Sequence, residues 1–141
     1  MEDTYDLNRF LLAQGEGLAR VMQELNSGRK TGHWMWYVFP QFQGLGSSPT
    51  AKLYAIKSED EAIAYLHHPV LGPRLLECTR AVTAHQNLTA EQIFGHPDCL
   101  KFRSCMTLFE KVAGEGSPFS YALERFFGGE SDRRTLALLN S

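Results

Sequence analysis

The chain has 141 residues and a mass of 15.9 kDa, which is the size of one domain and excludes a second full core. Hydrophobic residues make up 43% and charged residues 21%, as in ordinary globular proteins, so the composition excludes a disordered chain and a coiled coil. Fourteen basic and sixteen acidic residues give a net charge of -2, which excludes the broad positive surface of a non-specific nucleic-acid binder. A phosphate-bearing small ligand is compatible with this charge.

Membrane insertion and secretion are not indicated. No apolar run approaches the roughly 18 residues of a membrane span, and the N-terminus is acidic where a secretory signal would be basic. We therefore expect a cytoplasmic protein with neither a membrane nor a nucleic-acid partner.

A long amphipathic helix is predicted near the N-terminus. Apolar residues recur at intervals of three and four over residues 7–25, behind a candidate N-cap at Asp6. Gly15 and Gly17 each weaken a helix by about 1 kcal/mol relative to alanine, so we expect them to permit a close packing contact. Gly28 follows the end of this helix.

The rest of the chain is also read as helical. Further helices are expected over residues 33–39, from Ser58 to just before Pro69, over 71–85, 89–95 and 97–113, from Pro118 to Phe127, and after Ser131 or Asp132. No segment shows sustained period-two alternation, so strands are at most short, around Lys52–Ile56. The prediction is an all-α fold: a compact single-domain bundle of about six to seven helices with irregular loops over residues 1–141.

The helix predicted over residues 97–113 has the clearest core face. Six of its residues fall within one third of the helical wheel: Phe102, Cys105, Met106, Phe109, Val112 and Ala113. Lys101 and Ser104 form a polar strip beside that face, and Asp98 lies near the helix start. The strip is either solvated surface with Asp98 as a cap, or a pocket edge where Lys101 meets an anion and Ser104 donates a hydrogen bond.

Aromatic residues are dense between Lys30 and Phe42, a stretch that contains both tryptophans of the chain. A short helix there turns Trp36 and Phe39 toward the core, where aromatic side chains bury large areas. We therefore expect these two side chains to be buried.

The other aromatic residues of this stretch have two interpretations. Trp34, Tyr37 and His33 can pack in the core, or they can form a wall on which a planar ligand stacks. In the second case Lys30, His33 and Gln41 supply hydrogen-bond donors.

A glycine- and serine-rich loop follows over residues 43–50. Glycines let backbone N–H groups approach an anion closely, and the hydroxyls of Ser47 and Ser48 are further donors to a phosphate. No complete phosphate-loop motif is present, so a plain connecting loop is an equal alternative.

No metal site is predicted, and the sequence names no cofactor. His67 and His68 are adjacent and diverge on a helix, and the three cysteines fit no CxxC pair. The cysteines are expected to be buried free thiols.

Several motifs resemble a single family. They are Asp6-Leu7-x-Arg9-Phe10, Gly28-x-Lys30, HWMWYVFPQ at 33–41 with Gly44-Leu45-Gly46-Ser47-Ser48 behind it, Asp98-x-x-Lys101-x-x-Ser104 and Asp132-x-x-Thr135-Leu136. Over residues 6–139 the chain is similar to the mostly bacterial domain of unknown function 1810. The resemblance implies a compact all-helical fold without an established activity, cofactor or substrate.

Cys105 departs from the family pattern, because a serine is expected there. Proteins of this kind are sometimes called calpastatin. That label does not fit, because calpastatin acts through extended disordered segments and this chain has the composition of a folded core.

Two functional hypotheses follow. In the first, the 30–48 segment and the helix starting near 98 converge on a phosphorylated or nucleotide-like small molecule, which is bound or processed there. The ligand-binding residues would be Lys30, Trp34, Tyr37, Gln41, Ser47, Ser48, Asp98, Lys101 and Ser104, with His33 as the candidate general acid or base. In the second, the protein is a non-enzymatic interaction module whose aromatic segment is structural core.

Overall fold

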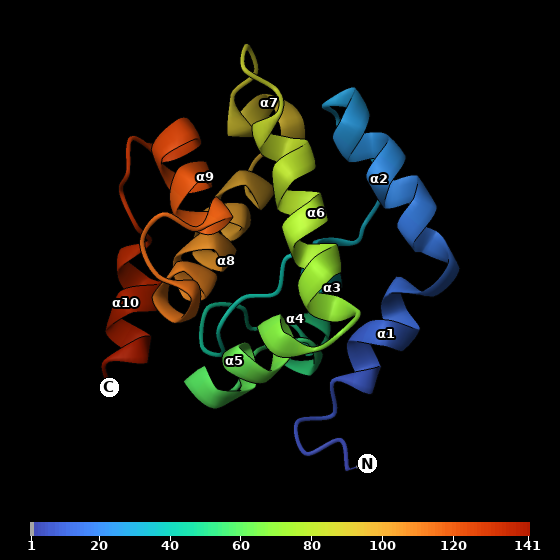
Figure 1. The fold of residues 1–141 in the computed structure, drawn as a ribbon, viewed down its shortest axis with the longest axis vertical. Coiled ribbons are helices and arrows are strands. Elements are labelled where there is room, and N and C mark those ends of the chain that lie inside the picture. Colours follow the sequence, from blue (N-terminus) through green and yellow to red (C-terminus); the bar gives the residue numbers. More distant parts are fainter. Residues whose placement is uncertain (1) are drawn as a thin grey trace.

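Helix α8 (Asp98–Ala113) is the central element of the structure, and helices from both halves of the chain pack around it (Figure 1). The computed structural model describes residues 2–141. The other helical elements are, in chain order, α1 (Asn8–Gln14), the 3-10 turn η1 (Gly15–Gly17), α2 (Leu18–Ser27), α3 (Met35–Val38), α4 (Pro49–Leu53), α5 (Glu59–His67), α6 (Leu71–Thr83), α7 (Ala90–Phe94), α9 (Pro118–Phe127) and α10 (Arg133–Leu139). Helix α8 contacts α3, α5, α7, α9 and α10.

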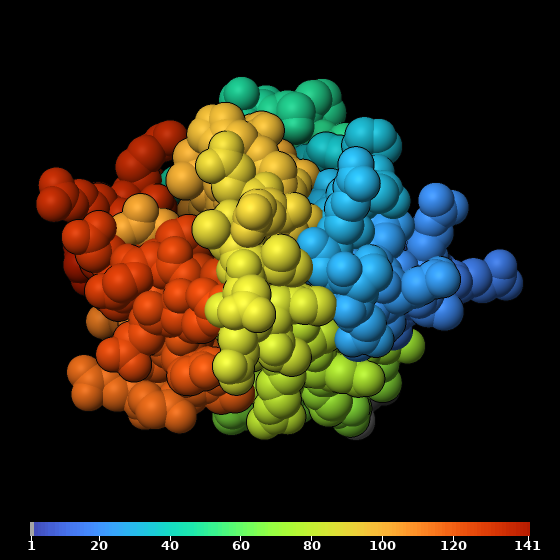
Figure 2. Space-filling view, turned by 90° about the horizontal axis from the view of Figure 1, so that it is seen from above, coloured from blue at the N-terminus to red at the C-terminus, as the bar shows by residue number. Residues whose placement is uncertain are grey.

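Helix α6 separates the two ends of the chain on one face of the molecule. It packs against α2 on one side and α9 on the other. Figure 2 shows its residues between the N-terminal helices and the C-terminal helices.

The all-α prediction is confirmed. Among residues 2–141 the only β pairing is an isolated parallel bridge between Phe42 and Ile56. The short strand expected around Lys52–Ile56 is wrong in its first half, because Ser48 caps a helix that begins at Pro49 and continues beyond Lys52. The bridge ties the aromatic segment to the residues that precede α5.

The described residues form more helices than the predicted six to seven, and several of these helices are shorter than predicted. The long N-terminal helix is broken at Gly15, whose φ of 28° is incompatible with a continuing helix. A methyl group at Gly15 or Gly17 would meet nothing within 4 Å, so the expected close packing contact is wrong. The break at Gly15 allows α1 to pack on α3 and α2 to pack on α6.

The predicted cap at Asp6 is also wrong. The Asp3 carboxylate accepts the backbone N–H groups of Leu7 at 2.7 Å and Asn8 at 2.8 Å, and so caps α1 from further upstream. The hydrogen bonds from Asn8 and Leu7 lower the pKa of Asp3 below its usual value. Asp6 instead adopts a left-handed conformation with φ 53°, which aspartate tolerates better than most residues.

Caps in the second half of the chain match the sequence prediction. Thr89 and Gln92 form a reciprocal capping box at α7. Ser117 caps α9 with Pro118 in its first turn, and Gly128 ends that helix in a left-handed conformation.

The buried face of α8 differs from the predicted one: more residues are buried in the middle of the helix, and fewer at its C-terminal end. Every residue from Ser104 to Phe109 is buried, including polar Thr107, because neighbours cover this stretch on all sides. Val112 is half-buried and Ala113 exposed, because the last turn extends beyond its neighbours. None of the helices within residues 2–141 has the length and apolar character that a membrane span requires.

Candidate functional site

The two segments singled out by their chemistry meet at Asp98. Its carboxylate pairs with Lys30 Nζ at 2.8 Å and with Lys101 Nζ at 3.3 Å. The Lys30 backbone N–H donates to the Ile93 carbonyl at 2.7 Å, which fixes the loop after α2 against α7. We call Lys30, Asp98 and Lys101 the Asp98 cluster.

The two lysines of the cluster differ in exposure. The Lys30 side chain is 8% exposed, and its ammonium group also donates to the Gly32 carbonyl at 2.6 Å. The Lys101 side chain is 30% exposed, and its ammonium group lies 5.7 Å from the centre of the Trp36 ring. Because two cations share one carboxylate, the cluster keeps one uncompensated positive charge, and Lys101 presents it.

The buried Glu24 carboxylate holds the loop that carries Lys30. Its Oε1 atom accepts the N–H groups of Thr31 at 2.7 Å and Gly32 at 2.9 Å, and the indole N–H of Trp34 at 3.0 Å. Desolvation raises the pKa of Glu24, but these hydrogen bonds outweigh it and lower the pKa from 4.5 to about 2. The loop therefore depends on an ionised Glu24.

The prediction that Trp36 is buried is wrong, and Trp34, for which both a core and a surface position were open, is the buried tryptophan. Trp34 is buried at 4% exposure, where its indole N–H reaches Glu24, and Trp36 is half-buried at the surface. The physical reason is that a buried indole needs a partner for its N–H, and Glu24 provides one only at position 34. Phe39 is buried as predicted and packs edge-on against Phe94 and Phe102.

Within residues 2–141 no hydrogen bond, ion pair or ring contact links Tyr37, Gln41 or His33 to the Asp98 cluster. The Tyr37 ring packs 5.4 Å from that of Tyr54. Gln41 lines a crevice of about 20 Å³ together with Trp36, and its carbonyl accepts the Ile56 N–H. His33 is exposed.

Two of the three predicted hydroxyl donors, Ser48 and Ser104, form hydrogen bonds within the protein. Ser48 Oγ caps α4 by accepting the Ala51 N–H at 3.1 Å, and Ser47 is exposed in the preceding loop. Ser104 is buried and donates to the Leu100 carbonyl at 3.1 Å. Their roles as ligand donors stay predictions. Ser48 Oγ accepts in its cap, so its O–H group is still able to donate to a ligand.

Backbone donors at the start of α8 are largely used. The N–H of Cys99 donates to the Gly95 carbonyl at 2.8 Å, and that of Leu100 donates to the Pro97 carbonyl at 2.9 Å. The charge of the cluster, more than the helix end, therefore determines what this surface can attract.

The cysteines are buried free thiols. Burial raises the pKa of Cys78 to about 12 and also raises those of Cys99 and Cys105, so the thiols stay protonated near neutral pH. Within residues 2–141 no group of three His, Cys, Asp or Glu side chains is arranged to hold a metal ion.

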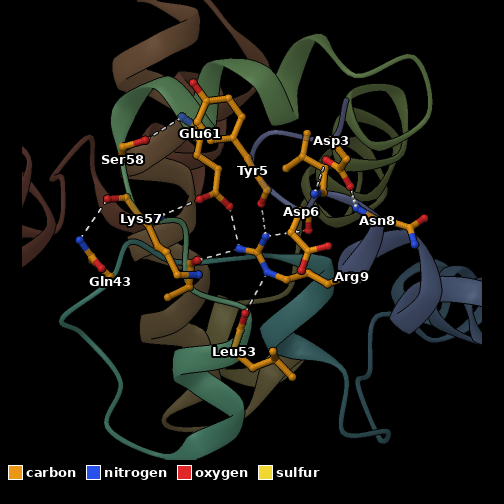
Figure 3. A network of polar contacts seen from close by, with 12 residues as sticks. Asp3, Tyr5, Asp6, Asn8, Arg9, Gln43, Leu53, Lys57, Ser58 and Glu61 are labelled. Atoms are coloured by element: carbon orange, nitrogen blue, oxygen red, sulfur yellow. Dashed lines mark hydrogen bonds and ion pairs between the residues drawn. The ribbon is translucent and has the colours of Figure 1, made fainter. Parts of the chain in front are cut away.

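A second charged centre joins the N-terminal segment to α5 (Figure 3). Arg9 Nη2 pairs with Glu61 Oε2 at 2.7 Å, with side chains 8% and 3% exposed. Arg9 also donates to the backbone carbonyls of four residues, namely Tyr5, Asp6, Leu53 and Ala55. We call this the Arg9–Glu61 junction.

Sequence reasoning missed the junction. The spacing of Ser58 and Glu61 is typical of a capping box, but the structure shows only the bond from the Glu61 N–H to Ser58 Oγ. The Glu61 carboxylate instead binds Arg9, 52 residues away. The available signal was an arginine in the first turn of a helix with an apolar stripe, which does not identify its partner.

Comparison with known proteins gives a family and a fold without an activity. A family model described as "Protein of unknown function (DUF1810)" matches residues 4–139. The crystal structure of the conserved hypothetical protein Rv1873 from Mycobacterium tuberculosis matches with a TM-score of 0.96 and 52% identity, over 99% of each chain. No curated protein matches the chain. Because the family model spans nearly the whole sequence, the chain belongs to the family of proteins of unknown function DUF1810.

Proposed function

We propose that this protein binds a small planar anion, of the phosphorylated or nucleotide-like kind, at the Asp98 cluster. One observation carries the proposal: two ammonium groups share the Asp98 carboxylate, and the outer one, on Lys101, lies over the ring of half-buried Trp36. A net positive charge beside a partly exposed aromatic ring suits a ligand that is both anionic and planar.

The two lysines have different parts in this proposal. Lys101 pairs with the anionic group while Trp36 stacks on the planar part. Lys30 is nearly buried and already donates to Gly32, so it engages Asp98 and leaves Lys101 less neutralised. A catalytic role for His33 stays a prediction.

One observation favours the second hypothesis, a non-enzymatic interaction module. The crevice beside Trp36 has a volume of about 20 Å³, which accommodates about one water molecule. A ligand would therefore lie on the surface, as a partner protein would.

The test uses adenosine monophosphate and inorganic phosphate as probes, with tryptophan fluorescence and thermal shift as readouts. For wild-type protein we expect adenosine monophosphate to quench Trp36 and to raise the melting temperature, with a weaker effect of phosphate. Trp36→Phe removes the quenching, and Lys101→Ala raises the dissociation constant by about tenfold, the effect of losing one charged contact worth about 1.4 kcal/mol.

Lys111→Ala is the matched control, because Lys111 is an exposed lysine on the last turn of the same helix. Its affinity should equal that of wild type. Equal responses of wild type and Lys101→Ala would remove the cluster from the site. The absence of any wild-type response would overturn the proposal in favour of the interaction module.

A further inference from the structure

A cleft of about 680 Å³ lies on the side of the molecule where the N-terminal segment faces α4 and the start of α5. Its volume is within the range of small-molecule sites, roughly 300–1,000 Å³. The Arg9–Glu61 junction forms part of its lining, and residues 4–6 form one wall. Figure 3 shows the junction that connects these elements.

The junction shapes the cleft, but Arg9 has no unused hydrogen-bond donor to offer a ligand. A guanidinium has five N–H donors, and all five of Arg9 are used within the protein. Glu61 accepts from Arg9 through one oxygen and from the Lys57 N–H at 3.1 Å through the other. The opposite charges of Arg9 and Glu61 also cancel.

The same bonds hold the wall of the cleft in place. Arg9 Nη1 donates to the Tyr5 carbonyl at 2.6 Å and to the Asp6 carbonyl at 2.8 Å. Asp3 binds the first amides of α1 from the other side. The wall is therefore ordered before any ligand arrives, which lowers the entropic cost of binding.

The free charges of the cleft are two lysines and one aspartate. Lys52 and Lys57 are exposed, and neither forms an ion pair with another residue in the described part of the chain. The Asp6 carboxylate is likewise exposed and unpaired within residues 2–141. The charges of Arg9 and Glu61 cancel, so the two lysines and the one aspartate leave the lining with a net charge of one positive unit.

The cleft also has an apolar part. Leu53 is 54% exposed although it lies in a helix, and it lines the cleft together with Pro49 and Tyr5. An exposed leucine beside two unpaired lysines suits a ligand that has an apolar body and an anionic end.

A neighbouring cleft provides an internal contrast. It has about 690 Å³, shares residues 4–6 with the first, and is lined by Glu2, Asp3 and His68 with no lysine or arginine. The two clefts have similar volumes but linings of opposite charge. We therefore expect an anion to bind in the cleft with Lys52 and Lys57 and not in its neighbour.

We propose that the cleft with Lys52 and Lys57 binds a small amphipathic anion, a molecule with a phosphate or carboxylate at one end and an apolar group at the other. The anionic end is held by the two lysines, and the apolar end covers Leu53 and Pro49. This site is separate from the Asp98 cluster, and its ligand differs in needing an apolar body instead of a planar one.

Hexyl phosphate is the probe, and inorganic phosphate and hexanol are its two halves. Titration calorimetry on the full chain should give a dissociation constant for hexyl phosphate at least about tenfold lower than for either half. In the double variant Lys52→Ala/Lys57→Ala we expect the dissociation constant for hexyl phosphate to rise about tenfold or more. Both side chains are exposed, so the melting temperature of this variant checks that the fold is kept.

Two further variants locate the site. Leu53→Asn should weaken the binding of hexyl phosphate and leave the affinity for inorganic phosphate unchanged. Lys101→Ala should bind hexyl phosphate as wild type does, which separates this proposal from the one at the Asp98 cluster. Equal affinity of wild type and the double lysine variant would overturn the proposal, and so would the absence of hexyl phosphate binding to wild type.

Discussion

The Arg9–Glu61 junction and the Asp98 cluster both use charge to join distant parts of the chain, but they differ in balance. At the junction one cation meets one anion, and every donor of the guanidinium has an acceptor. At the cluster two cations meet one anion, and the outer lysine is 30% exposed. A balanced, saturated pair stabilises the fold, whereas the three charged groups near the surface retain a net positive charge.

The difference has a geometric counterpart. The junction is built from α1, α5 and backbone carbonyls of the N-terminal segment, the end of α4 and the loop before α5, so its removal would affect several segments at once. The cluster joins one loop to the first turn of α8, and Glu24 secures that loop independently. Substitutions at the junction should therefore cost more stability than substitutions at the cluster.

The largest expected effect is at Arg9. Arg9→Met leaves the buried Glu61 carboxylate without its cation, and we expect a loss of about 3–5 kcal/mol in the free energy of unfolding, measured by urea denaturation. The double variant Arg9→Met/Glu61→Leu should be more stable than the single variant, because no unpaired charge remains. A double variant no more stable than Arg9→Met would show that the charge balance is not what the junction contributes.

The next effect is a pH dependence that arises at Glu24. Its pKa is about 2 in the folded protein and 4.5 when the chain is unfolded, so the unfolded state binds the proton first as pH falls. The stabilisation is complete above pH 4.5 and is lost as pH falls toward 2, with a total loss of about 1–3 kcal/mol.

Glu24→Gln tests this dependence, because it keeps one oxygen acceptor for the loop and cannot titrate. The difference in unfolding free energy between wild type and Glu24→Gln, measured by urea denaturation from pH 6 to 2, should shrink as pH falls. A constant difference across this range would contradict the assigned role of the Glu24 carboxylate.

A smaller effect is expected at Asp98. Asp98→Asn leaves two neighbouring ammonium groups without a counter-charge, and Lys30 retains only its bond to Gly32. We expect a loss of about 1–2 kcal/mol, because the carboxylate is partly exposed and water compensates in part. A loss as large as that of Arg9→Met would remove the proposed distinction between the two centres.

The smallest effect is expected at Lys101. Its side chain is partly exposed and its bond to Asp98 is the longer of the pair, so Lys101→Ala should change the unfolding free energy by less than about 0.5 kcal/mol. Thermal unfolding monitored by circular dichroism measures this change. A loss above about 1 kcal/mol would mean that Lys101 is part of the architecture and is not reserved for a ligand.

The sequence predicted the second half of the fold better than the first. Helices α7 and α9 begin with side-chain caps that lie within three residues of the amides they bind, so local reasoning found them. The N-terminal helix was misread because periodicity continues across Gly15, and only the backbone angle there shows the break. Asp3 was missed as a cap because it acts across an irregular turn.

Prediction of the candidate site was less complete. The sequence singled out Lys30, Asp98 and Lys101 by chemistry, and the structure brings these three together. It did not identify Trp36 as the aromatic residue at their side, because a helix of four residues has too little periodicity to define a buried face.

By itself the sequence determined the all-helical class, most helix boundaries and the chemistry available near residues 30 and 98, because these follow from capping, periodicity and residue type over a few positions. Tertiary structure alone decided three further properties: that Trp34 is the buried tryptophan, that Arg9 is saturated by Glu61, and that Lys52 and Lys57 border an open cleft. The physical reason is that each depends on a partner or surface supplied by a distant part of the chain, as Glu61 is 52 residues away from Arg9 in sequence. A local sequence pattern does not identify such a distant partner.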